Sequence, residues 1–174
     1  MTLNRHDDKA YSEYVRKVFR KLFHEEPRVY IRESVVNIVL SRSRLVDFCT
    51  SIGLKIGDKV RQSVDIPSWV KRRAVYRIAC VRGLMDTDGC IYNECHSIRN
   101  KRYCYPRLSF VNHSIPLRRS VFAILSALGF SPTMRNNRSV HLESRDDIMQ
   151  YFNIIGTSNP KHRMRFQNVL GEVG

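Results

Sequence analysis

The sequence lacks a long apolar run, since none of its apolar stretches approaches the roughly 18–20 residues of a membrane-spanning helix. Its first residues, MTLNRHDDK, carry charges where a secretion signal has its apolar segment. Its five cysteines are odd in number and irregularly spaced, which predicts reduced thiols rather than a disulfide framework. Together these absences predict an intracellular protein with no membrane partner.

Acidic residues are also scarce. The chain of 174 residues has 16 Asp and Glu against 30 Lys and Arg, a formal net charge of +14. The excess is present in both 1–72 (15 basic, 9 acidic) and 73–174 (15 basic, 7 acidic), so it is not a basic tail. Arginine supplies 22 of the basic residues, and its planar guanidinium can hold phosphate or guanine through two hydrogen bonds. Composition therefore predicts a nucleic-acid partner, with an anionic membrane surface as the weaker alternative.

Apolar periodicity and turn residues predict an α+β fold. Helices are expected over about 9–24, 42–52, 68–85, 115–128, 145–155 and 160–170. Strands are expected over 29–31, 35–40, 90–94, 103–112, 132–135 and 139–143. In the second helix the buried side is expected to hold Leu45, Val46, Phe48 and Cys49.

Two parts of the chain superpose when the sequence is shifted by about 103 residues. The matched pairs include Val18 with Val121, Phe19 with Phe122, Leu45 with Ile148, Phe48 with Tyr151, Ile52 with Ile155 and Gly53 with Gly156. A helix and hairpin at 68–112 precede the second copy, and nothing similar precedes the first. The pattern predicts a partial N-terminal repeat over 1–67 and a complete repeat over 68–174, with chance similarity of two amphipathic stretches as the alternative.

One segment of nine residues carries the most chemistry. Val81-Arg82-Gly83-Leu84-Met85-Asp86-Thr87-Asp88-Gly89 resembles the signature of the LAGLIDADG homing endonucleases, with Gly83, Leu84, Asp86, Asp88 and Gly89 identical. It lies at the end of a predicted helix that runs straight into a strand. Residues 151–162 (YFNIIGTSNPKH) and 7–60 also look like later parts of the family's repeat, so the resemblance covers nearly the whole chain.

The resemblance implies a fold. In this family each repeat is αββαββα, and two repeats pair through their motif helices so that their sheets form a saddle over DNA. The chain departs from this pattern because the first motif is missing. The small residue Gly83 would let two such helices pack closely, which predicts either a homodimer or a complementing motif-bearing fragment.

The same resemblance implies a site-specific endonuclease of homing type, associated with an intron or an intein, that hydrolyses double-stranded DNA with Mg²⁺. We expect Asp88 and the Gly89 carbonyl to supply the hard oxygen ligands that Mg²⁺ prefers, with Asp86 more structural. Lys161, and Lys59 at the matching place in the first copy, are candidates to polarise the phosphate or orient water, with solvated lysines as the alternative. Arg118 and Asn112 are candidates to order water or phosphate, with a structural role as the alternative. One Asp88 per chain predicts that a lone monomer nicks DNA rather than cutting both strands.

Alternation along the strands predicts the surface that reads DNA. Leu108 and Phe110 point inward, so their neighbours on the strand point outward into a major groove. The candidate DNA-binding residues are Arg32, Arg99, Lys101, Arg102, Tyr105, Arg107, Ser109, Arg135, Arg138 and His141. For each of them alone, a solvated surface side chain is the alternative.

Other interpretations remain open at this point. Cys90, Cys95, His96 and Cys104 are candidates for a zinc site, although they lack paired C-x₂-C spacing, and Cys95 and Cys104 alternatively face each other across a hairpin. The alternative functions are a non-catalytic nucleic-acid-binding remnant, a maturase-like or regulatory module on the same fold, and a structural protein with no nucleic-acid partner.

Overall fold

The computed structural model of the chain describes residues 1–58 and 61–171, and its fold is α+β, as expected. The helices are α1 (Lys9–Phe23), α2 (Ser43–Ser51), α3 (Ser68–Lys71), α4 (Ala74–Asp88), α5 (Ile115–Ala127), α6 (Arg145–Ile154) and α7 (Pro160–Gly171). The strands are β1 (Thr2–Asn4), β2 (Arg28–Arg32), β3 (Val35–Val39), β4 (Gly89–Ile98), β5 (Lys101–Val111), β6 (Thr133–Arg135) and β7 (Ser139–Leu142). None of the helices in the described part of the chain is long and apolar enough to cross a membrane.

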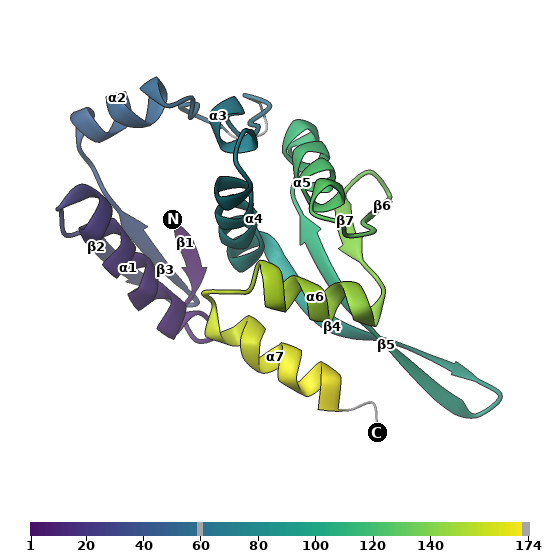
Figure 1. Cartoon of the computed structure of the whole chain (residues 1–174). Coiled ribbons are helices and arrows are strands. Elements are labelled where there is room, and N and C mark those ends of the chain that lie inside the picture. The colour runs from purple at the N-terminus through teal and green to yellow at the C-terminus, as the bar shows by residue number, and fades with distance from the viewer. Residues whose placement is uncertain (59–60, 172–174) are drawn as a thin grey trace.

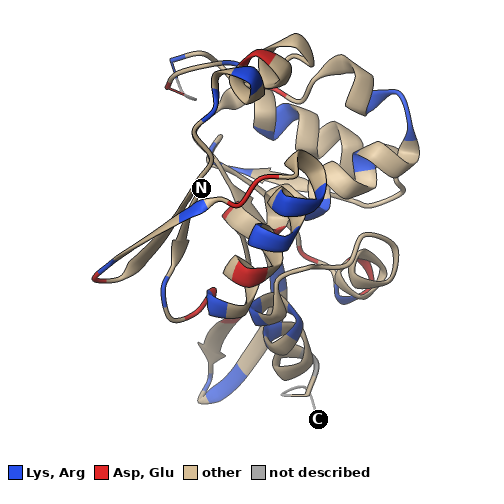
Figure 2. Ribbon diagram, turned by 90° about the vertical axis from the view of Figure 1, so that its left-hand side faces the viewer, with Lys and Arg blue, Asp and Glu red and all other residues tan. Residues whose placement is uncertain are grey.

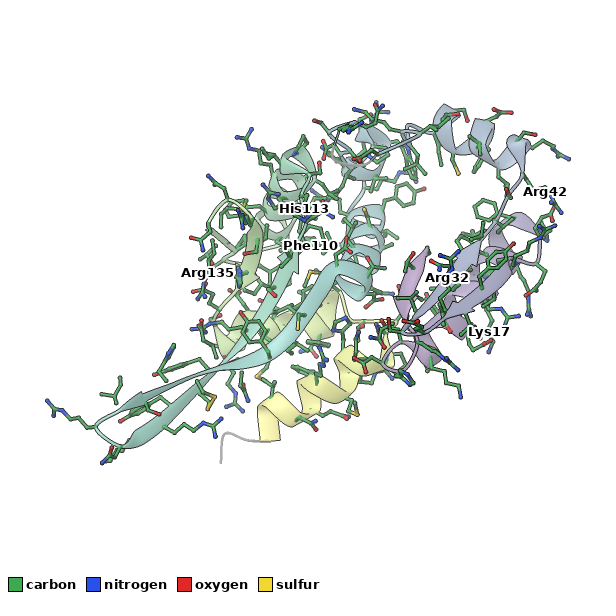
Figure 3. The ribbon with its side chains drawn as sticks, turned by 180° about the vertical axis from the view of Figure 1, so that it is seen from behind. Lys17, Arg32, Arg42, Phe110, His113 and Arg135 are labelled. Carbon is green, nitrogen blue, oxygen red and sulfur yellow. A yellow bond between two sulfur atoms is a disulfide. The ribbon has the colours of Figure 1, made fainter. Side chains whose placement is uncertain are left out.

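The strands form two antiparallel sheets, with the orders β1-β3-β2 and β4-β5-β7-β6. Helix α1 covers one face of the first sheet, and α4, α5 and α6 cover one face of the second. In Figure 1 the covering helices of both sheets lie on the viewer's side, and Figure 3 shows the strands from the opposite side. Both sheets therefore leave an open face on the same side of the molecule.

The two halves differ in the size of their cores. The second half buries a large cluster that includes Val81 and Met85 of α4, Phe110 of β5 and Tyr151 of α6. The cluster of the first half is limited to Leu3, Tyr11, Val15, Val36 and Ile38, with Phe19 packed against it. The boundary at residue 67 stays a prediction, and Ile66, just before it, is buried in the cluster of the second half.

Short turns build the two hairpins of the second sheet. Arg99 and Asn100 connect β4 to β5, and both have positive φ values, of 49° and 63°. Asn136 and Asn137 connect β6 to β7 and also have positive φ values, of 50° and 49°. Asparagine enters this left-handed region more readily than most residues, which is why a turn forms there, between the two expected strands. The β4–β5 hairpin extends well beyond the helices (Figure 1).

Three expectations about the helices are wrong. The helix expected over 68–85 is two helices, because Arg73 is extended (φ −121°, ψ 135°) between α3 and α4. The helix also does not end at Met85, since α4 continues to Asp88 and β4 begins at Gly89, so the expected direct passage from helix to strand is present. The expected buried side of α2 is not buried: Val46 and Phe48 are 43% and 52% exposed, while Leu45 and Cys49 are half-buried.

Candidate active site and nucleic-acid interface

Asp88 is the last residue of α4, and its side chain is exposed at the point where the helix becomes β4. The next residue, Gly89, donates its backbone N–H to the carbonyl of Met85. A Cβ atom at Gly89 would lie 2.3 Å from that carbonyl oxygen, so only glycine fits this junction. The sequence therefore joins helix and strand with no loop, and it places a carboxylate at the joint.

Asn112 holds the Asp88 carboxylate from the end of β5. Its Nδ2 donates to Asp88 Oδ2 at 3.0 Å, and its Oδ1 accepts from the backbone N–H of Ser114 at 2.9 Å. Arg118 of α5 is 5% exposed and donates to the backbone carbonyl of Asn112. Arg118 is a candidate to order water or phosphate, with a structural role as the alternative. Its burial favours the structural role, in which it holds the loop that positions Asn112.

The Asp88 carboxylate opens onto a cavity of about 580 Å³ between the two halves of the chain. Asn112 and Thr87 line it from the second half, and Met1 and Thr2 line it from the first. Among the described residues no three His, Cys, Asp or Glu side chains gather as a metal site. Asp65 also lines the cavity, but its carboxylate pairs with Lys71 at 2.7 Å. The Asp88 carboxylate supplies one hard oxygen ligand, which fits a Mg²⁺ ion whose other ligands are mainly waters.

Asp86 lies one helical half-turn away and has the structural role expected of it. It is 3% exposed, and its carboxylate accepts from the Thr157 hydroxyl and from the Ser158 backbone N–H at 2.8 Å. Its backbone carbonyl accepts from Asn159 Nδ2 at 3.1 Å. These bonds fix the end of α4 to the loop between α6 and α7.

Lys161 faces the first half of the chain. Its ammonium lies 2.7 Å from Asp8 Oδ1, and Asn159 Nδ2 donates to the same carboxylate oxygen at 3.1 Å. Burial alone would raise the pKa of Asp8, but hydrogen bonds from Lys161 and Asn159 outweigh it and lower the pKa. This ion pair favours a structural role for Lys161. The other candidate lysine, Lys59, lies outside the described residues.

The strand registers assign side chains to the open faces of the sheets. On the second sheet these residues include Tyr92, Glu94, His96, Lys101, Tyr103, Tyr105, Arg107, Val111, Thr133 and Arg135. On the first sheet they include Thr2, Arg28, Tyr30, Arg32 and Asn37. Arg28, Tyr30, Tyr92 and Glu94 are additional to the sequence-based candidates. The alternation of Val29 and Ile31 with Arg28, Tyr30 and Arg32 was the available signal for the first sheet.

An ion network lies on the open face of the second sheet. Glu94 accepts from Arg107 Nε at 2.8 Å and from Arg135 Nη1 at 3.1 Å, which brings β4, β5 and β6 together. Glu143 accepts from Arg135 Nε at 2.6 Å, and its backbone carbonyl accepts from Arg107 Nη1 at 2.8 Å. Hydrogen bonds from Arg135 and Arg107 lower the pKa of Glu94 to about 2. The two arginines are thus held in place before any ligand arrives.

Three candidates for DNA contact lie differently from expectation. Ser109 and His141 pair across β5 and β7 on the open face, but they are only 4% and 6% exposed. They occupy inner strands between larger side chains, so the expectation that they are exposed is wrong. Burial, together with the Arg135 charge, lowers the pKa of His141.

Arg102 pairs with Ser97 on the other face of the hairpin, beside Cys95 Sγ. Arg32, Arg99, Lys101, Tyr105 and Arg138 are exposed, and Arg107 and Arg135 are half-buried.

The cysteines correct two expectations. Cys95 and Cys104 lie directly opposite each other in the β4–β5 hairpin, with a Cα–Cα distance of 4.1 Å, and form a disulfide. The expectation of reduced thiols is therefore wrong for this pair, while Cys49, Cys80 and Cys90 are free. A zinc site at Cys90, Cys95, His96 and Cys104 is also wrong, since the described residues contain no such ligand group.

Basic residues occur along both halves of the chain (Figure 2), and Arg32 and Arg135 mark the first and second sheets in Figure 3. No protein-family model and no curated protein matches the sequence. Solved structures do match. The meganuclease I-SmaMI bound to uncleaveable DNA has a TM-score of 0.63 at 9% identity, over 98% of this chain and 77% of that one. The I-LtrWI LAGLIDADG homing endonuclease bound to target DNA has a TM-score of 0.60 at 11% identity, over 99% and 76%.

The fold is that of the LAGLIDADG homing endonucleases. The LAGLIDADG meganuclease I-AabMI, bound to uncleaved DNA, agrees with a TM-score of 0.58 at 9% identity, over 98% of this chain and 79% of that one. The order expected of a LAGLIDADG repeat, αββαββα, runs from α4 to α6 in the second half. The first half contains the order β1-α1-β2-β3-α2, which is the later part of the same repeat.

Proposed function

We propose that this chain is a site-specific DNA endonuclease of homing type that acts inside the cell on a long duplex target. The observation that carries the proposal is the Asp88 carboxylate, exposed at the α4–β4 joint and open to a 580 Å³ cavity, on a fold shared with DNA-bound endonucleases. The membership of the LAGLIDADG family that the motif implies belongs to the same proposal.

The residues at Asp88 fit a magnesium site. Asp88 and the Gly89 carbonyl would hold the ion, with waters and a DNA phosphate as the remaining ligands. A bound divalent ion activates water as a nucleophile and stabilises charge on the phosphate. Asn112 fixes the orientation of the carboxylate through its hydrogen bond, and Arg118 holds Asn112 in turn.

The open faces of the two sheets would bind the duplex. Arg28 and Arg32 on the first sheet, with Lys101 and Arg107 on the second, supply positive charge for phosphates and donors for bases. Aromatic side chains lie among them, and Arg107 stands over the Tyr105 ring with 5.6 Å between its guanidinium carbon and the ring centroid. Such an interface would attract the duplex through the net charge of +14, to which both halves of the chain contribute.

A second candidate function rests on there being one motif, with its Asp88, in the chain. A binding remnant, or a maturase-like or regulatory module, needs the open faces but not the cleavage chemistry. With one Asp88 per chain, a lone active monomer would nick one strand, and double-strand cleavage would need a second acidic site from a partner.

Cleavage of a supercoiled plasmid library separates these candidates. We expect Mg²⁺-dependent nicking by the wild type, abolished by EDTA and reduced at least about 100-fold in Asp88→Asn, with DNA binding retained. Asp47→Asn, an equally conservative change on exposed α2, should nick like the wild type. DNA binding without nicking would establish the remnant instead, and equal nicking by Asp88→Asn would remove Asp88 from the chemistry.

A further inference from the structure

The outer part of the β4–β5 hairpin projects away from the core (Figure 1). The structure describes all of residues 94–105, and none of them is buried. Strand β7 pairs with β5 over residues 108–111, and Pro106 lacks the N–H that would continue this pairing toward the tip. A two-stranded ribbon without a hydrophobic face is marginally stable in water. Its main-chain hydrogen bonds alone would therefore give this segment little order.

Cys95 and Cys104 link the two strands covalently within this segment. They lie opposite each other with 4.1 Å between their Cα atoms, which is the close, non-hydrogen-bonded kind of antiparallel pair. The disulfide closes residues 96–103, which include the turn, into a small ring. This ring leaves the chain far fewer conformations than it has when the thiols are free. The link therefore supplies the constraint that a core supplies elsewhere in the sheet.

Side chains that would contact DNA lie within this ring. Lys101 and Tyr103 point to the open face of the sheet, and Arg99 is exposed in the turn. Cys95 and Cys104 point to the opposite face, because side chains alternate along a strand. The disulfide is therefore made or broken without a change in the groups presented to a duplex, and only the order of those groups changes.

The two sulfur atoms have the surroundings of reactive thiols. Both cysteines are half-buried on an exposed hairpin, so a small reagent reaches them from solvent. Arg102 Nη2 lies 3.6 Å from Cys95 Sγ, and a neighbouring guanidinium favours the thiolate, which is the form that attacks disulfides. By contrast, burial raises the pKa of the Cys80 thiol, which disfavours its reaction. Exchange with a small reagent is therefore favoured at the hairpin pair over Cys80.

We propose that Cys95 and Cys104 form a thiol–disulfide exchange site, which switches the hairpin between an ordered, oxidised form and a loosely ordered, reduced form that holds DNA more weakly. The oxidant is a small-molecule disulfide such as oxidised glutathione. One cysteine thiolate attacks it to give a mixed disulfide and releases one thiol, and the second cysteine then displaces the other thiol. The protein pair loses two protons and two electrons, and the reagent is reduced to two thiols. The effect on DNA rests on the proposed function, whereas the change in hairpin order does not.

Amide hydrogen exchange tests the change in order. We expect amides of residues 96–103 in the full chain to exchange at least about tenfold faster after reduction with dithiothreitol, and to slow again when oxidised glutathione is added. Amides of residues 139–142 in β7 should not change. Cys95→Ser with Cys104→Ser should exchange like the reduced wild type under both conditions, and Cys49→Ser should respond like the wild type. Equal exchange in the oxidised and reduced forms of the wild type would overturn the proposal.

Arg102 gives the exchange step a test of its own. Arg102→Gln should slow the reaction of the reduced hairpin with oxidised glutathione at least about threefold near pH 7, because less of the Cys95 thiol is ionised. The difference should disappear near about pH 10, where a thiol ionises without help. Lys101→Gln, which removes the same charge from the other face, is the control and should react like the wild type. Equal rates in the two variants near pH 7 would overturn this role of Arg102.

DNA binding tests the consequence, with a duplex selected by the oxidised chain from a random-sequence pool as the probe. We expect reduction to weaken binding about 5–10-fold, because ordering the hairpin then costs conformational entropy. Cys95→Ser with Cys104→Ser should bind like the reduced form. Ser97→Cys with Arg102→Cys, made in that double variant, moves the link toward the tip, and its oxidised form should bind more tightly than its own reduced form.

Two negative results have different meanings. Equal affinities of the oxidised and reduced wild type for the selected duplex would overturn the proposed control of DNA binding. Failure of both forms to bind any duplex would instead contradict the proposed function, and hydrogen exchange would still decide whether the hairpin switches.

Discussion

Asn112 donates from its side-chain amide to the Asp88 carboxylate at 3.0 Å, which joins the end of β5 to the end of α4. We predict that Asn112→Ala raises the Mg²⁺ concentration needed for half-maximal nicking by about 10–100-fold, because partners of a ligand fix its orientation. Magnesium titrations of nicking check this. Ser97→Ala, on the β4–β5 hairpin, is the control. An unchanged magnesium requirement in Asn112→Ala would show that Asp88 needs no such support.

Arg32 on the first sheet should contact DNA phosphate. We predict that the affinity of the wild type falls at least about a thousandfold between 50 and 200 mM salt, and that Arg32→Gln reduces the salt slope by about one. Lys17→Gln is the matched control, since Lys17 is exposed on α1, which covers the other side of that sheet. Binding insensitive to salt would instead favour a structural protein without a nucleic-acid partner.

Glu94 should affect which bases are read more than how tightly DNA is held. Glu94→Gln removes the charge that holds Arg107 and Arg135 in place, while it also removes a negative charge from the interface. We predict that discrimination between the preferred target and single-base variants falls by about 1–3 kcal/mol at one or two positions, without loss of affinity. Competition binding on a variant panel measures this, with Glu13→Gln on α1 as control. Uniform weakening at all positions would contradict the prediction.

Lys161 should stabilise the contact between the two halves. The pKa of Asp8 is lowered below its ordinary 3.8, so the contribution of the Asp8 charge to stability is present above that pH and lost as the pH falls through the lowered value. We predict that Lys161→Met lowers the free energy of unfolding by about 2 kcal/mol at pH 7, and by less below pH 3.8. Urea unfolding at both pH values checks this. A pH-independent difference would mean that packing, not charge, explains the loss.

Local signals in the sequence predicted most of the elements. Ser144 caps α6 by accepting from the Asp147 backbone N–H at 3.0 Å, and Asn136 and Asn137 make the expected turn. Glycines end three of the helices in left-handed conformations, at Gly53, Gly129 and Gly156. Each of these features depends on residues only a few positions apart, which is why the sequence reveals them.

Features that depend on distant residues were harder to predict. The burial of Arg118, the pairing of Lys161 with Asp8 and the covering of His141 are decided by residues far away in the chain. The exposed side of α2 has the same origin: its periodicity is that of a packed helix, but no residue of it is buried by the part of the chain that the structure describes. Within the site, the motif predicted the position of Asp88, but not the cavity it faces.

The direct passage of α4 into β4 has a mechanical consequence. Glu94 and Ile98, at the outer end of the hairpin, belong to the same strand as Gly89. The surface that would read bases and the carboxylate that would bind metal are therefore joined by one continuous strand. Ten strand residues span roughly 33 Å. A mismatched nucleobase that displaces the outer end of β4 would also shift the Asp88 carboxylate at the inner end of the strand. A mismatched target would therefore be cut more slowly than its binding affinity alone would imply.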